Sequence, residues 1–302
     1  PGSPLIEGSD TPYVFLPEDN RENSHVFIQD VWHFANDWEL TAGVRYDHYS
    51  DFGDTVNPRL ALVWSTRHNL TTKLLYGEAF RAPSFGETRV QSNPAFLGNP
   101  NLEPETLKSY EIAFNYKPTF DLTLDLNIFR YKWKDIIQYV TDISGGTRTA
   151  QNEGEQNGHG IEFEANWEVN DWLTVLTNYS WQDSEDENTD TDAANAPEQQ
   201  FYIRGMAELP HEVDLNIQVN SVMDRNRAFG DVRSDIDDYT TVDVTLRKRF
   251  AGDQLELSLL AKNLFDEDAF EPSLNATPVP LIPNDLPLAG RRILGEVRYK
   301  FN

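Results

Sequence analysis

The residues best suited to chemistry are the carboxylates of segment 183–198, which holds seven acidic side chains. Oxygen ligands in such a run could bind Ca²⁺, as they do in an EF-hand loop. Counting Asp186 as the first ligand places Thr191 at the sixth position, where that loop requires Gly, and Pro197 at the twelfth, where it requires Glu. The sequence therefore rejects an EF-hand and predicts a solvated loop, because like charges in a run repel one another. Weak binding of divalent cations stays open, and no specific metal site is predicted.

Catalytic motifs are missing from the sequence. The six His residues are dispersed, and neither a His-Glu-x-x-His motif nor a Gly-rich phosphate loop after a strand occurs. Because the chain has no Cys, disulfides, thiolate nucleophiles and Cys-ligated zinc or iron–sulfur sites are excluded. A carboxylate pair on a sheet could imitate a glycosidase, but this interpretation has little support. We predict that the chain is not an enzyme and has no cofactor.

The charge balance excludes further classes. The 302 residues include 25 Lys and Arg against 50 Asp and Glu, a net charge of −25. Nucleic-acid binding requires clustered cations that neutralise phosphates, and a polybasic membrane-surface module requires the same. No run of eighteen apolar residues is present, so no transmembrane helix is predicted. The composition alone therefore argues against a membrane protein, and only the pattern of the residues can change that.

Polar and apolar residues alternate along most of the chain, which is the period of a β-strand with two different faces. The clearest segments are 121–128, 160–170 and 212–220. The apolar parity changes at Phe129, which we interpret as a bulge or as the point where the strand leaves an apolar layer. Ten less regular strands are expected at about 24–35, 38–49, 58–67, 70–81, 106–117, 172–182, 199–209, 239–250, 254–264 and 291–301. The prediction is thus thirteen strands and almost no helix.

The connections between these strands alternate between short and long. The short ones are Asn36-Asp37, Thr66–Asn69, Pro118-Thr119, Asn170-Asp171, Leu209–His211 and Ala251–Asp253, and the long ones are about 50–57, 82–105, 141–157, 183–198, 221–238 and 265–290. This order is typical of a transmembrane up-and-down antiparallel β-barrel, whereas a Greek-key sandwich has long connections at both ends. Strands of about 10–14 residues can cross a bilayer. Aromatic residues near the strand ends favour interfacial girdles. Since only one face of each strand then needs to be apolar, an acidic chain can still span a membrane.

The odd strand count indicates a larger barrel. Bacterial barrels of one chain have an even number of strands, and thirteen leave two edges whose backbone groups lipid cannot hydrate. We therefore interpret residues 1–23 as an irregular N-terminal segment and residues 24–302 as one portion of a barrel.

Four motifs support this interpretation. They are Phe80-Arg81-Ala82-Pro83, Asn99-Pro100-Asn101-Leu102, the strand around Val242-Asp243, and Asn263-Leu264-Phe265-Asp266 before the last strand. In this order and spacing, residues 24–302 resemble the C-terminal half of TonB-dependent outer-membrane receptors. The resemblance implies a 22-stranded barrel with an N-terminal plug domain, of which this chain would supply thirteen strands without the plug. It also implies the outer membrane of a Gram-negative bacterium, contact with its lipid, and a TonB complex that acts through the plug.

The resemblance implies that the loop between the first two motifs is extracellular and near the ligand. Haem receptors of this family carry a haem-contacting His there, and Ser84–Gly98 contain none. An active-transport receptor for a ferric siderophore is therefore expected, ahead of haem, cobalamin, copper or a carbohydrate; the alternative from another class is a passive porin. Phe85, Arg89 and Phe96 are the candidate ligand contacts, with ordinary loop packing as the competing explanation.

Two further sets of residues have expected roles under this resemblance. Charged residues on the polar faces would meet the plug or the water around it; they are Glu162, Glu164, Glu168, Asp214, Glu256, Glu296 and Arg298. In the last strand, Tyr299 and Phe301 resemble the signal that the barrel-assembly machinery reads. The usual terminal Phe of the family is here followed by Asn302.

Overall fold

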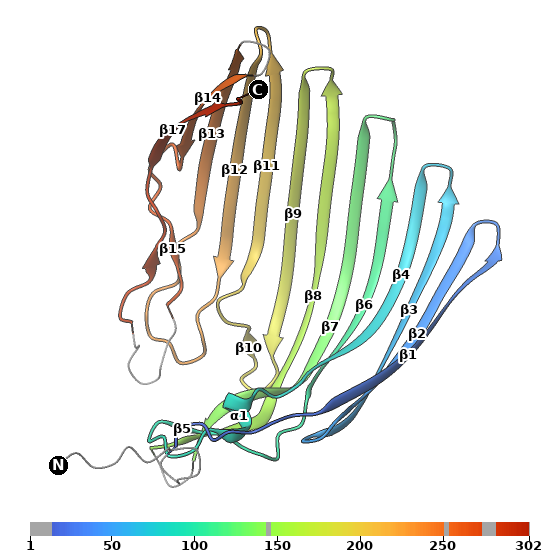
Figure 1. Cartoon of the computed structure of the whole chain (residues 1–302), viewed down its shortest axis with the longest axis vertical. Coiled ribbons are helices and arrows are strands. Elements are labelled where there is room, and N and C mark those ends of the chain that lie inside the picture. The colour runs from blue at the N-terminus through green and yellow to red at the C-terminus, as the bar shows by residue number, and fades with distance from the viewer. Residues whose placement is uncertain (1–13, 143–145, 251–253, 274–281, 302) are drawn as a thin grey trace.

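The computed structural model describes residues 14–142, 146–250, 254–273 and 282–301. Thirteen strands follow one another through a single sheet (Figure 1). They are β1 (Asn23–Ala35), β2 (Trp38–Tyr49), β3 (Gly53–Arg67), β4 (Leu70–Arg81), β6 (Glu105–Tyr116), β7 (Leu122–Thr141), β8 (Arg148–Asn170), β9 (Leu173–Asp186), β11 (Pro197–Leu209), β12 (Val213–Arg225), β13 (Tyr239–Phe250), β14 (Leu255–Lys262) and β17 (Arg292–Tyr299). The remaining elements are short: α1 (Phe85–Arg89), β5 (Phe96–Leu97), β10 (Thr191–Asp192), β15 (Phe270–Glu271) and β16 (Leu286–Pro287).

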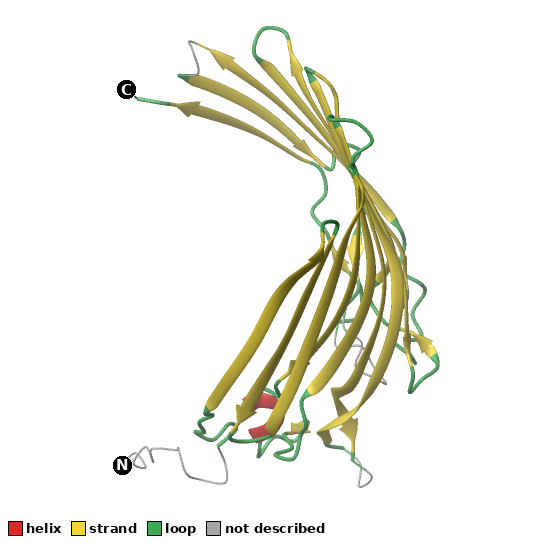
Figure 2. Cartoon of the chain, turned by 90° about the vertical axis from the view of Figure 1, so that its right-hand side faces the viewer, coloured by secondary structure: helices red, strands yellow, loops and turns green. Residues whose placement is uncertain are grey.

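The sheet is an up-and-down antiparallel sheet, as predicted. Each of the thirteen strands pairs with the next one along the chain, and all these pairs are antiparallel. The sheet is strongly curved and open, with β1 at one edge and β17 at the other (Figures 1 and 2). No helix in the described part of the chain is long and apolar enough to cross a bilayer.

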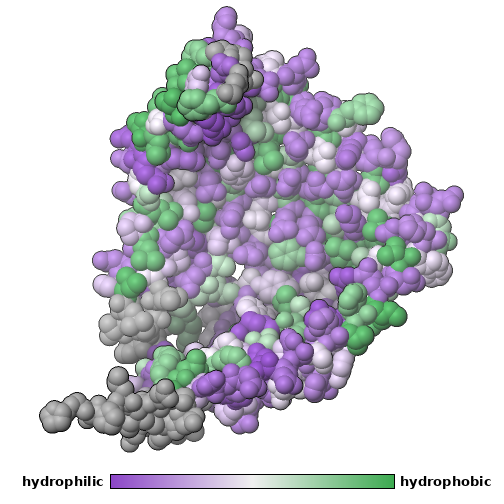
Figure 3. Space-filling model, in the orientation of Figure 1, coloured by the Kyte–Doolittle hydropathy of each residue, from purple (hydrophilic) through white to green (hydrophobic). Residues whose placement is uncertain are grey.

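The two faces of the sheet differ in polarity, because successive side chains of a strand point to opposite sides. On the convex face, the register aligns Leu74, Ile112, Ile128, Ile161 and Trp181 in one continuous row across β4, β6, β7, β8 and β9. On the concave face, a parallel row contains Asn115, Asp125, Glu164, Asn178, Tyr202 and Asn220. The concave face is the one seen in Figure 1, and it is predominantly hydrophilic (Figure 3). The apolar side chains therefore cover the outside of the curve instead of filling a core.

Several strands are longer than the sequence predicts, and the loops are correspondingly shorter. β7 has 20 residues and β8 has 23, so the expected long loop at 141–157 shrinks to residues 142–147. β3 begins at Gly53, so the expected loop at 50–57 is also a short connection, and the predicted strict alternation of loop lengths is wrong there. The physical reason is that strand pairing continues beyond the apolar layer, where no alternation of hydrophobicity is needed to satisfy the backbone.

The change of apolar parity at Phe129 is not a bulge. The pairing of β7 with β8 runs without a shift from Leu122 to Trp133, and the irregularity lies further on, between Trp133 and Ile137. Phe129 and Tyr131 lie on the concave face, directly opposite Gly160 and Gly158 of β8. The other of the two interpretations, that the strand leaves the apolar layer here, agrees with the structure.

Parts of the predicted organisation stay untested. Residues 14–22 precede β1 and contain no strand, but residues 1–13 of the predicted irregular segment lie outside the described residues. The same holds for the predicted turn at Ala251–Asp253 and for Asn302. The division of the chain at residue 23 therefore remains a prediction.

The end of the last strand provides a first testable prediction. Tyr299 lies in β17, and the ring of the exposed Phe301 packs on it with a centroid distance of 4.8 Å. If the chain is an outer-membrane barrel, as the resemblance implies, Phe301→Ala is expected to lower its yield in the outer membrane at least about twofold, because an exposed aromatic residue is available for recognition. The measurement is the amount of folded receptor in isolated outer membranes, with Phe229→Ala, another exposed Phe in a loop, as the control. An unchanged yield would refute an assembly role for Phe301.

Candidate ligand-binding loops and lumenal wall

The loop between β4 and β6, residues 82–104, is folded around the short helix α1. Ser84 caps this helix: its hydroxyl accepts from the Glu87 backbone N–H, and the Glu87 carboxylate accepts from the Ser84 N–H at 2.7 Å. Such a reciprocal capping box satisfies donors that a helix start leaves free. Burial alone would raise the pKa of Glu87, but hydrogen bonds from Arg81 and Ser84 hold it below its ordinary value. Glu87 is thus an anion fixed at the root of the loop.

The second half of the loop packs closely against α1 and the residue after it. Gly98 and Asn99 donate backbone hydrogen bonds of 2.8 Å to the carbonyls of Val90 and Glu87. A Cβ at Gly98 would lie 2.7 Å from the Arg89 nitrogen, so only glycine fits this approach. Next to it, β5 pairs in parallel with the start of β8. The loop is therefore an ordered structure that is attached through β5 to the β7–β8 hairpin.

The Phe80-Arg81-Ala82-Pro83 motif connects this loop to the barrel wall. The Arg81 guanidinium donates to Glu87 at 2.9 and 3.0 Å and also to Glu105, the first residue of β6. Glu105 is 2% exposed and accepts two more hydrogen bonds, from Trp133 Nε1 at 3.1 Å and from the Ile137 backbone N–H at 2.9 Å. Arg81 thus joins the start and the end of the loop through two carboxylates, and Glu105 in turn holds the bulged part of β7.

The Asn99-Pro100-Asn101-Leu102 motif has a similar bracing role. Asn99 Nδ2 donates to the Ala150 carbonyl at 3.0 Å, and its Oδ1 accepts from the Asn101 N–H at 3.0 Å. Leu102 is buried. Nearby, Asn152 of β8 donates to the carbonyls of Glu103 and Asp135 and accepts from the Glu103 N–H. The contacts of both motifs in this structure are internal ones that shape the loop.

The three predicted ligand contacts lie together but are engaged by the segment before β1. The Arg21 guanidinium lies 5.0 Å from the centre of the Phe85 ring, and Arg89 forms an ion pair with Asp19 that lowers the pKa of that carboxyl group. The Phe96 ring packs edge-on against Phe15 and Tyr139, with centroids 6.1 and 5.3 Å away. Loop packing therefore accounts for the contacts observed here. Their role toward a ligand remains a prediction.

Arg21 is a residue that the sequence reasoning missed. It donates to Asp51 at 2.6 Å and to the Pro83 carbonyl at 2.7 Å, and it stacks over Tyr49 and Phe52 as well as Phe85. It therefore binds the segment before β1, the β2–β3 turn and the β4–β6 loop into one assembly. No sequence signal identifies it, because its hydrogen-bond partners Asp51 and Pro83 lie 30 and 62 residues away along the chain.

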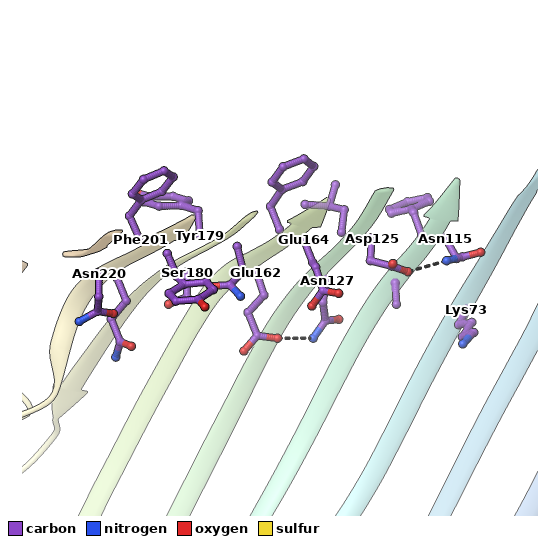
Figure 4. Close-up of a pocket in the computed structure, with 17 residues that line it drawn as sticks. Lys73, Asn115, Asp125, Asn127, Glu162, Glu164, Tyr179, Ser180, Phe201 and Asn220 are labelled. Atoms are coloured by element: carbon purple, nitrogen blue, oxygen red, sulfur yellow. Dashed lines mark hydrogen bonds between the residues drawn. The ribbon is translucent and has the colours of Figure 1, made fainter. Parts of the chain in front are cut away.

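A second candidate site is a groove of about 540 Å³ on the concave face, here called the lumenal groove (Figure 4). The polar side chains that line it on the concave face and are labelled in Figure 4 are Lys73, Asn115, Asp125, Asn127, Glu162, Glu164, Ser180 and Asn220. Asn115 donates to Asp125 at 2.6 Å, and Asn127 bridges Glu111 and Glu162 at 3.3 and 3.2 Å. The amide groups of Asn115 and Asn127 thus donate hydrogen bonds to neighbouring carboxylates, which fixes the positions of these acidic side chains. The groove was not predicted as a site, although Glu162 and Glu164 were predicted to face the lumen.

The wall of β12 to β17 has a different composition. Arg249 lies 3.1 Å from Asp214, and Glu256 lies 3.4 Å from both Arg247 and Arg298. Arg298 also contacts Glu296 at 2.9 Å. The register places these charged residues on the concave face, as expected. This part of the wall is a lattice of ion pairs, whereas the lumenal groove is mainly acidic.

The acidic segment between β9 and β11 forms no metal site in this structure. Among the residues that the structure describes, no group of three or more His, Asp or Glu is arranged to hold a metal ion. Asp186 Oδ1 instead accepts from the Asn188 and Thr189 N–H groups at 2.9 and 3.3 Å. Asp186, which would be the first ligand of the rejected EF-hand, is thus a turn residue.

Two other loops are held together by a cluster of four charged residues, Arg227, Asp231, Arg233 and Asp285, here called the loop clasp. Arg227 donates to Asp285 at 2.6 and 3.0 Å, and Arg233 donates to Asp231 at 2.6 Å and to the Ser273 hydroxyl at 2.6 Å. The hydrogen bond from Arg233 lowers the pKa of Asp231 to about 2, and the bond from Arg227 lowers that of Asp285. The clasp joins the β12–β13 loop to the β14–β17 loop.

The clasp predicts a pH response. Since both carboxyl groups have a pKa below that of an unfolded Asp, their contribution is fully present above about pH 4 and is lost as the pH falls through the lowered pKa values, of which that of Asp231 is about 2. A spin label at Val232, which is 95% exposed, is expected to keep its mobility from pH 7 to about 4 and to become more mobile as the pH falls further. Asp285→Asn should show the mobile spectrum already at pH 7. A label whose mobility is the same at pH 7 and 2 would contradict the clasp.

Comparison with known proteins agrees with this architecture. Residues 4–264 match the family model described as TonB dependent receptor-like, beta-barrel, and the chain belongs to this family. The family consists of outer-membrane receptors of Gram-negative bacteria that are transporters and not enzymes. The predicted fold class, membrane location and absence of enzymatic activity are therefore confirmed at the level of the family.

The relatives that the chain resembles have different names and lengths. An iron-regulated outer membrane virulence protein of Vibrio cholerae is 34% identical over 119 residues, 38% of this chain and 18% of that protein. The vitamin B12 transporter BtuB of Photobacterium profundum is 27% identical over 271 residues, 87% of this chain and 42% of that protein. The heme/hemopexin utilization protein C of Haemophilus influenzae is 30% identical over 208 residues, 57% of this chain and 29% of that protein. The chain thus spans less than half the length of these relatives.

Solved structures show the same fold. The siderophore receptor PirA of Acinetobacter baumannii superposes with a TM-score of 0.74 at 18% identity, over 93% of this chain and 46% of that one. A mutant of the ferric enterobactin receptor PfeA of Pseudomonas aeruginosa gives 0.77 at 19% identity, over 93% and 45%. At these identities the likeness concerns the fold alone.

Proposed function

We propose that this chain forms the C-terminal portion of the barrel of a TonB-dependent receptor that imports a ferric siderophore across the outer membrane. In the whole receptor a plug domain would fill the concave side, and a TonB complex would displace it to admit the ligand. The family match over residues 4–264 supports active transport instead of a passive porin. The iron-regulated relative supports an iron chelate as the cargo.

The charge of the concave face narrows the class of siderophore. The lumenal groove is lined by Asp125, Glu162 and Glu164 and by one cation, Lys73, and the β9–β11 segment adds acidic side chains. A cleft lined by one sign of charge raises the local concentration of ligands of the opposite sign and repels like-charged ones. A ferric complex that is neutral or positive, such as a hydroxamate type, therefore suits this wall better than a strongly anionic tris-catecholate. The acidic groove is the observation that carries this choice.

Cobalamin is the second candidate. It is supported by the match to vitamin B12 transporters, which extends over 87% of the chain, and cobalamin, a large corrin, carries no strong negative charge that the groove would repel. The acidic groove alone therefore does not separate the two cargoes.

A growth-rescue panel tests the proposal. A strain that lacks the full-length gene is grown on a ferric hydroxamate, a ferric tris-catecholate, haem or cobalamin as the limiting nutrient, with and without the restored gene. Rescue by the ferric hydroxamate alone is expected. Rescue by cobalamin alone would establish the second candidate, and rescue by no iron compound would reject the siderophore assignment.

Variants of the groove test the electrostatic argument in the same strain. Glu162→Gln combined with Glu164→Gln is expected to weaken uptake of a cationic ferric hydroxamate about threefold or more, because two charges that concentrate the ligand are removed without a change in shape. Glu168→Gln, on the same strand but outside the groove lining, is the matched control. Equal uptake by the double variant and the control would contradict a role for the acidic groove.

A further inference from the structure

Two aromatic rings of β7 lie side by side on the concave wall. Phe129 and Tyr131 are both partly exposed, and their ring planes are inclined by only 16°, with the centroids 6.5 Å apart. They share the concave face because they are two residues apart in one strand. Together they form an elongated aromatic surface, here called the aromatic platform.

Glycines of β8 allow these rings to lie flat on the sheet. A Cβ at Gly158 would overlap three atoms of Tyr131 at once, Cε1, Cζ and Oη, and a Cβ at Gly160 would lie 2.6 Å from Cζ of Phe129. Gly158 therefore lies beneath a face of the phenol ring and not at its edge, a close approach that glycine in a strand permits. Since the two ring planes are nearly parallel, the opposite face of each ring is turned to the lumen.

The surroundings of Tyr131 keep this surface open and fixed. Its hydroxyl lies 2.9 Å from the Ser184 hydroxyl and accepts from Gln156 Nε2 at 2.7 Å, which holds the ring in place. The residues that share its concave-face row on β4, β6, β8 and β9 are all small: Gly77, Ser109, Gly158 and Ser184.

Carboxylates border the platform on the side of the lumenal groove. The register places Glu111 directly opposite Phe129, and Glu162 lies one concave-face row nearer the start of β7. Asn127 donates to Glu111 and Glu162 at 3.3 and 3.2 Å, and Glu162 is exposed (Figure 4). The wall thus offers an apolar surface with positioned hydrogen-bond acceptors at its border.

These parts together suit a sugar ring. The face of an aromatic ring carries partial negative charge and attracts the positively polarised C–H groups of a ligand. A sugar ring has C–H groups on its faces and hydroxyl donors around its edge, and carboxylates accept from hydroxyls. An organic cation is the competing ligand, but it needs the face of a single ring, whereas two rings extend this surface along the strand.

We propose that the aromatic platform binds a hexose, with the sugar ring on Phe129 and Tyr131 and its hydroxyls donating to Glu111 and Glu162. Further along β7, Trp133 donates to Glu105 at the root of the β4–β6 loop, so the platform lies between that loop and the lumenal groove. A ligand that enters from the loops therefore reaches the platform first. The hexose belongs either to a free oligosaccharide or to a glycosylated cargo, and the proposal does not depend on the iron chelate proposed above.

Ligand binding by the full-length receptor, purified in a detergent without a sugar headgroup, tests the proposal. Isothermal titration calorimetry measures the affinities for maltohexaose, for choline, and for a ferric tris-catecholate with and without attached glucose. Maltohexaose is expected to bind more tightly than choline if the sugar is free. A preference of about fivefold for the glucosylated chelate is expected if the sugar is part of the cargo. The charge of the two chelates cancels in this ratio, because both carry it.

Tyr131→Leu is expected to weaken binding of the sugar ligand about fivefold, because it removes one ring face, while Tyr131→Phe retains the affinity. Tyr116→Leu is the matched control, since Tyr116 is exposed on the convex face of β6, opposite Leu124. A receptor that neither binds maltohexaose nor prefers the glucosylated chelate would overturn the proposal without any variant. So would choline that binds more tightly than either sugar ligand, or a Tyr131→Leu receptor with unchanged affinity.

Discussion

Replacement of Glu105 by Ala is expected to lower the free energy of unfolding of the full-length receptor by about 3 kcal/mol, because buried donors lose their acceptor. Glu105 is 2% exposed and accepts from Trp133 Nε1 and the Ile137 N–H, both in β7, as well as from Arg81. Ala leaves the Trp133 and Ile137 donors without their acceptor in a place that water reaches poorly, while Arg81 keeps its hydrogen bonds to Glu87. The bulged end of β7 and the root of the β4–β6 loop should loosen together.

Equilibrium urea unfolding in lipid vesicles measures this effect, and limited proteolysis within residues 82–104 locates it. Glu103→Ala is the matched control, because Glu103 lies two residues away, is exposed, and takes part in the loop through its backbone N–H and carbonyl. It is expected to change the unfolding free energy by less than about 0.5 kcal/mol. Equal effects of the two substitutions would show that Glu105 does not anchor the loop.

Replacement of Gly160 by Val is expected to destabilise the barrel by about 2–3 kcal/mol through overpacking. A Cβ at this position would overlap the Trp181 carbonyl oxygen of β9 and would lie 2.6 Å from Cζ of the Phe129 ring. The carbonyl belongs to the strand ladder and cannot move aside. The ring, which covers the glycine on the concave face, has to leave its position.

The control for this prediction is Gly205→Val in β11, where a Cβ would meet no atom within 4 Å. It is expected to leave the urea midpoint unchanged or to raise it slightly, since Val favours a strand more than Gly does. The comparison is made on folded receptor extracted from outer membranes. If Gly160→Val unfolds at the same urea concentration as Gly205→Val, the close packing of Phe129 on β8 does not contribute to stability.

The arrangement of the strands could be predicted from the sequence because each strand carries its own signal. In 212–220, for example, apolar and polar residues alternate without exception, and the segment is β12 from Val213 onward. The tight turns are also local. The prediction was wrong for the strand ends beyond the apolar layer. Residues 148–157 of β8 form a strand although polar and apolar residues do not alternate regularly there. There the backbone hydrogen bonds of β8 are made with β7. Such pairing between strands requires no alternation of polar and apolar residues, so the sequence of β8 alone does not reveal it.

The family motifs did not predict the contacts that their residues make. Phe80-Arg81-Ala82-Pro83 and Asn99-Pro100-Asn101-Leu102 indicated the family, which the match over residues 4–264 confirms, but not what these residues contact. Arg81 reaches Glu105, 24 residues away, and Asn99 reaches Ala150, 51 residues away. Which side chains meet across such distances depends on the register and curvature of the sheet. The predicted ligand contacts Phe85, Arg89 and Phe96 belong to the β4–β6 loop and their role toward a ligand stays a prediction, while their partners Arg21 and Asp19 were not foreseen.

The sequence by itself determined that this acidic chain is a sheet with one apolar and one polar face, since alternation is a property of consecutive residues. The tertiary structure alone decided which carboxylates share the lumenal groove and which charged residues face one another across neighbouring strands. Asp125 meets Glu164, and Lys132 meets Lys108, only through pairing between strands. The net charge of −25 is a sum over the whole chain and shows none of these pairings. Curvature and register place an acidic groove on the concave face and an apolar row on the convex face, because neighbours in a sheet are set by hydrogen bonds between strands.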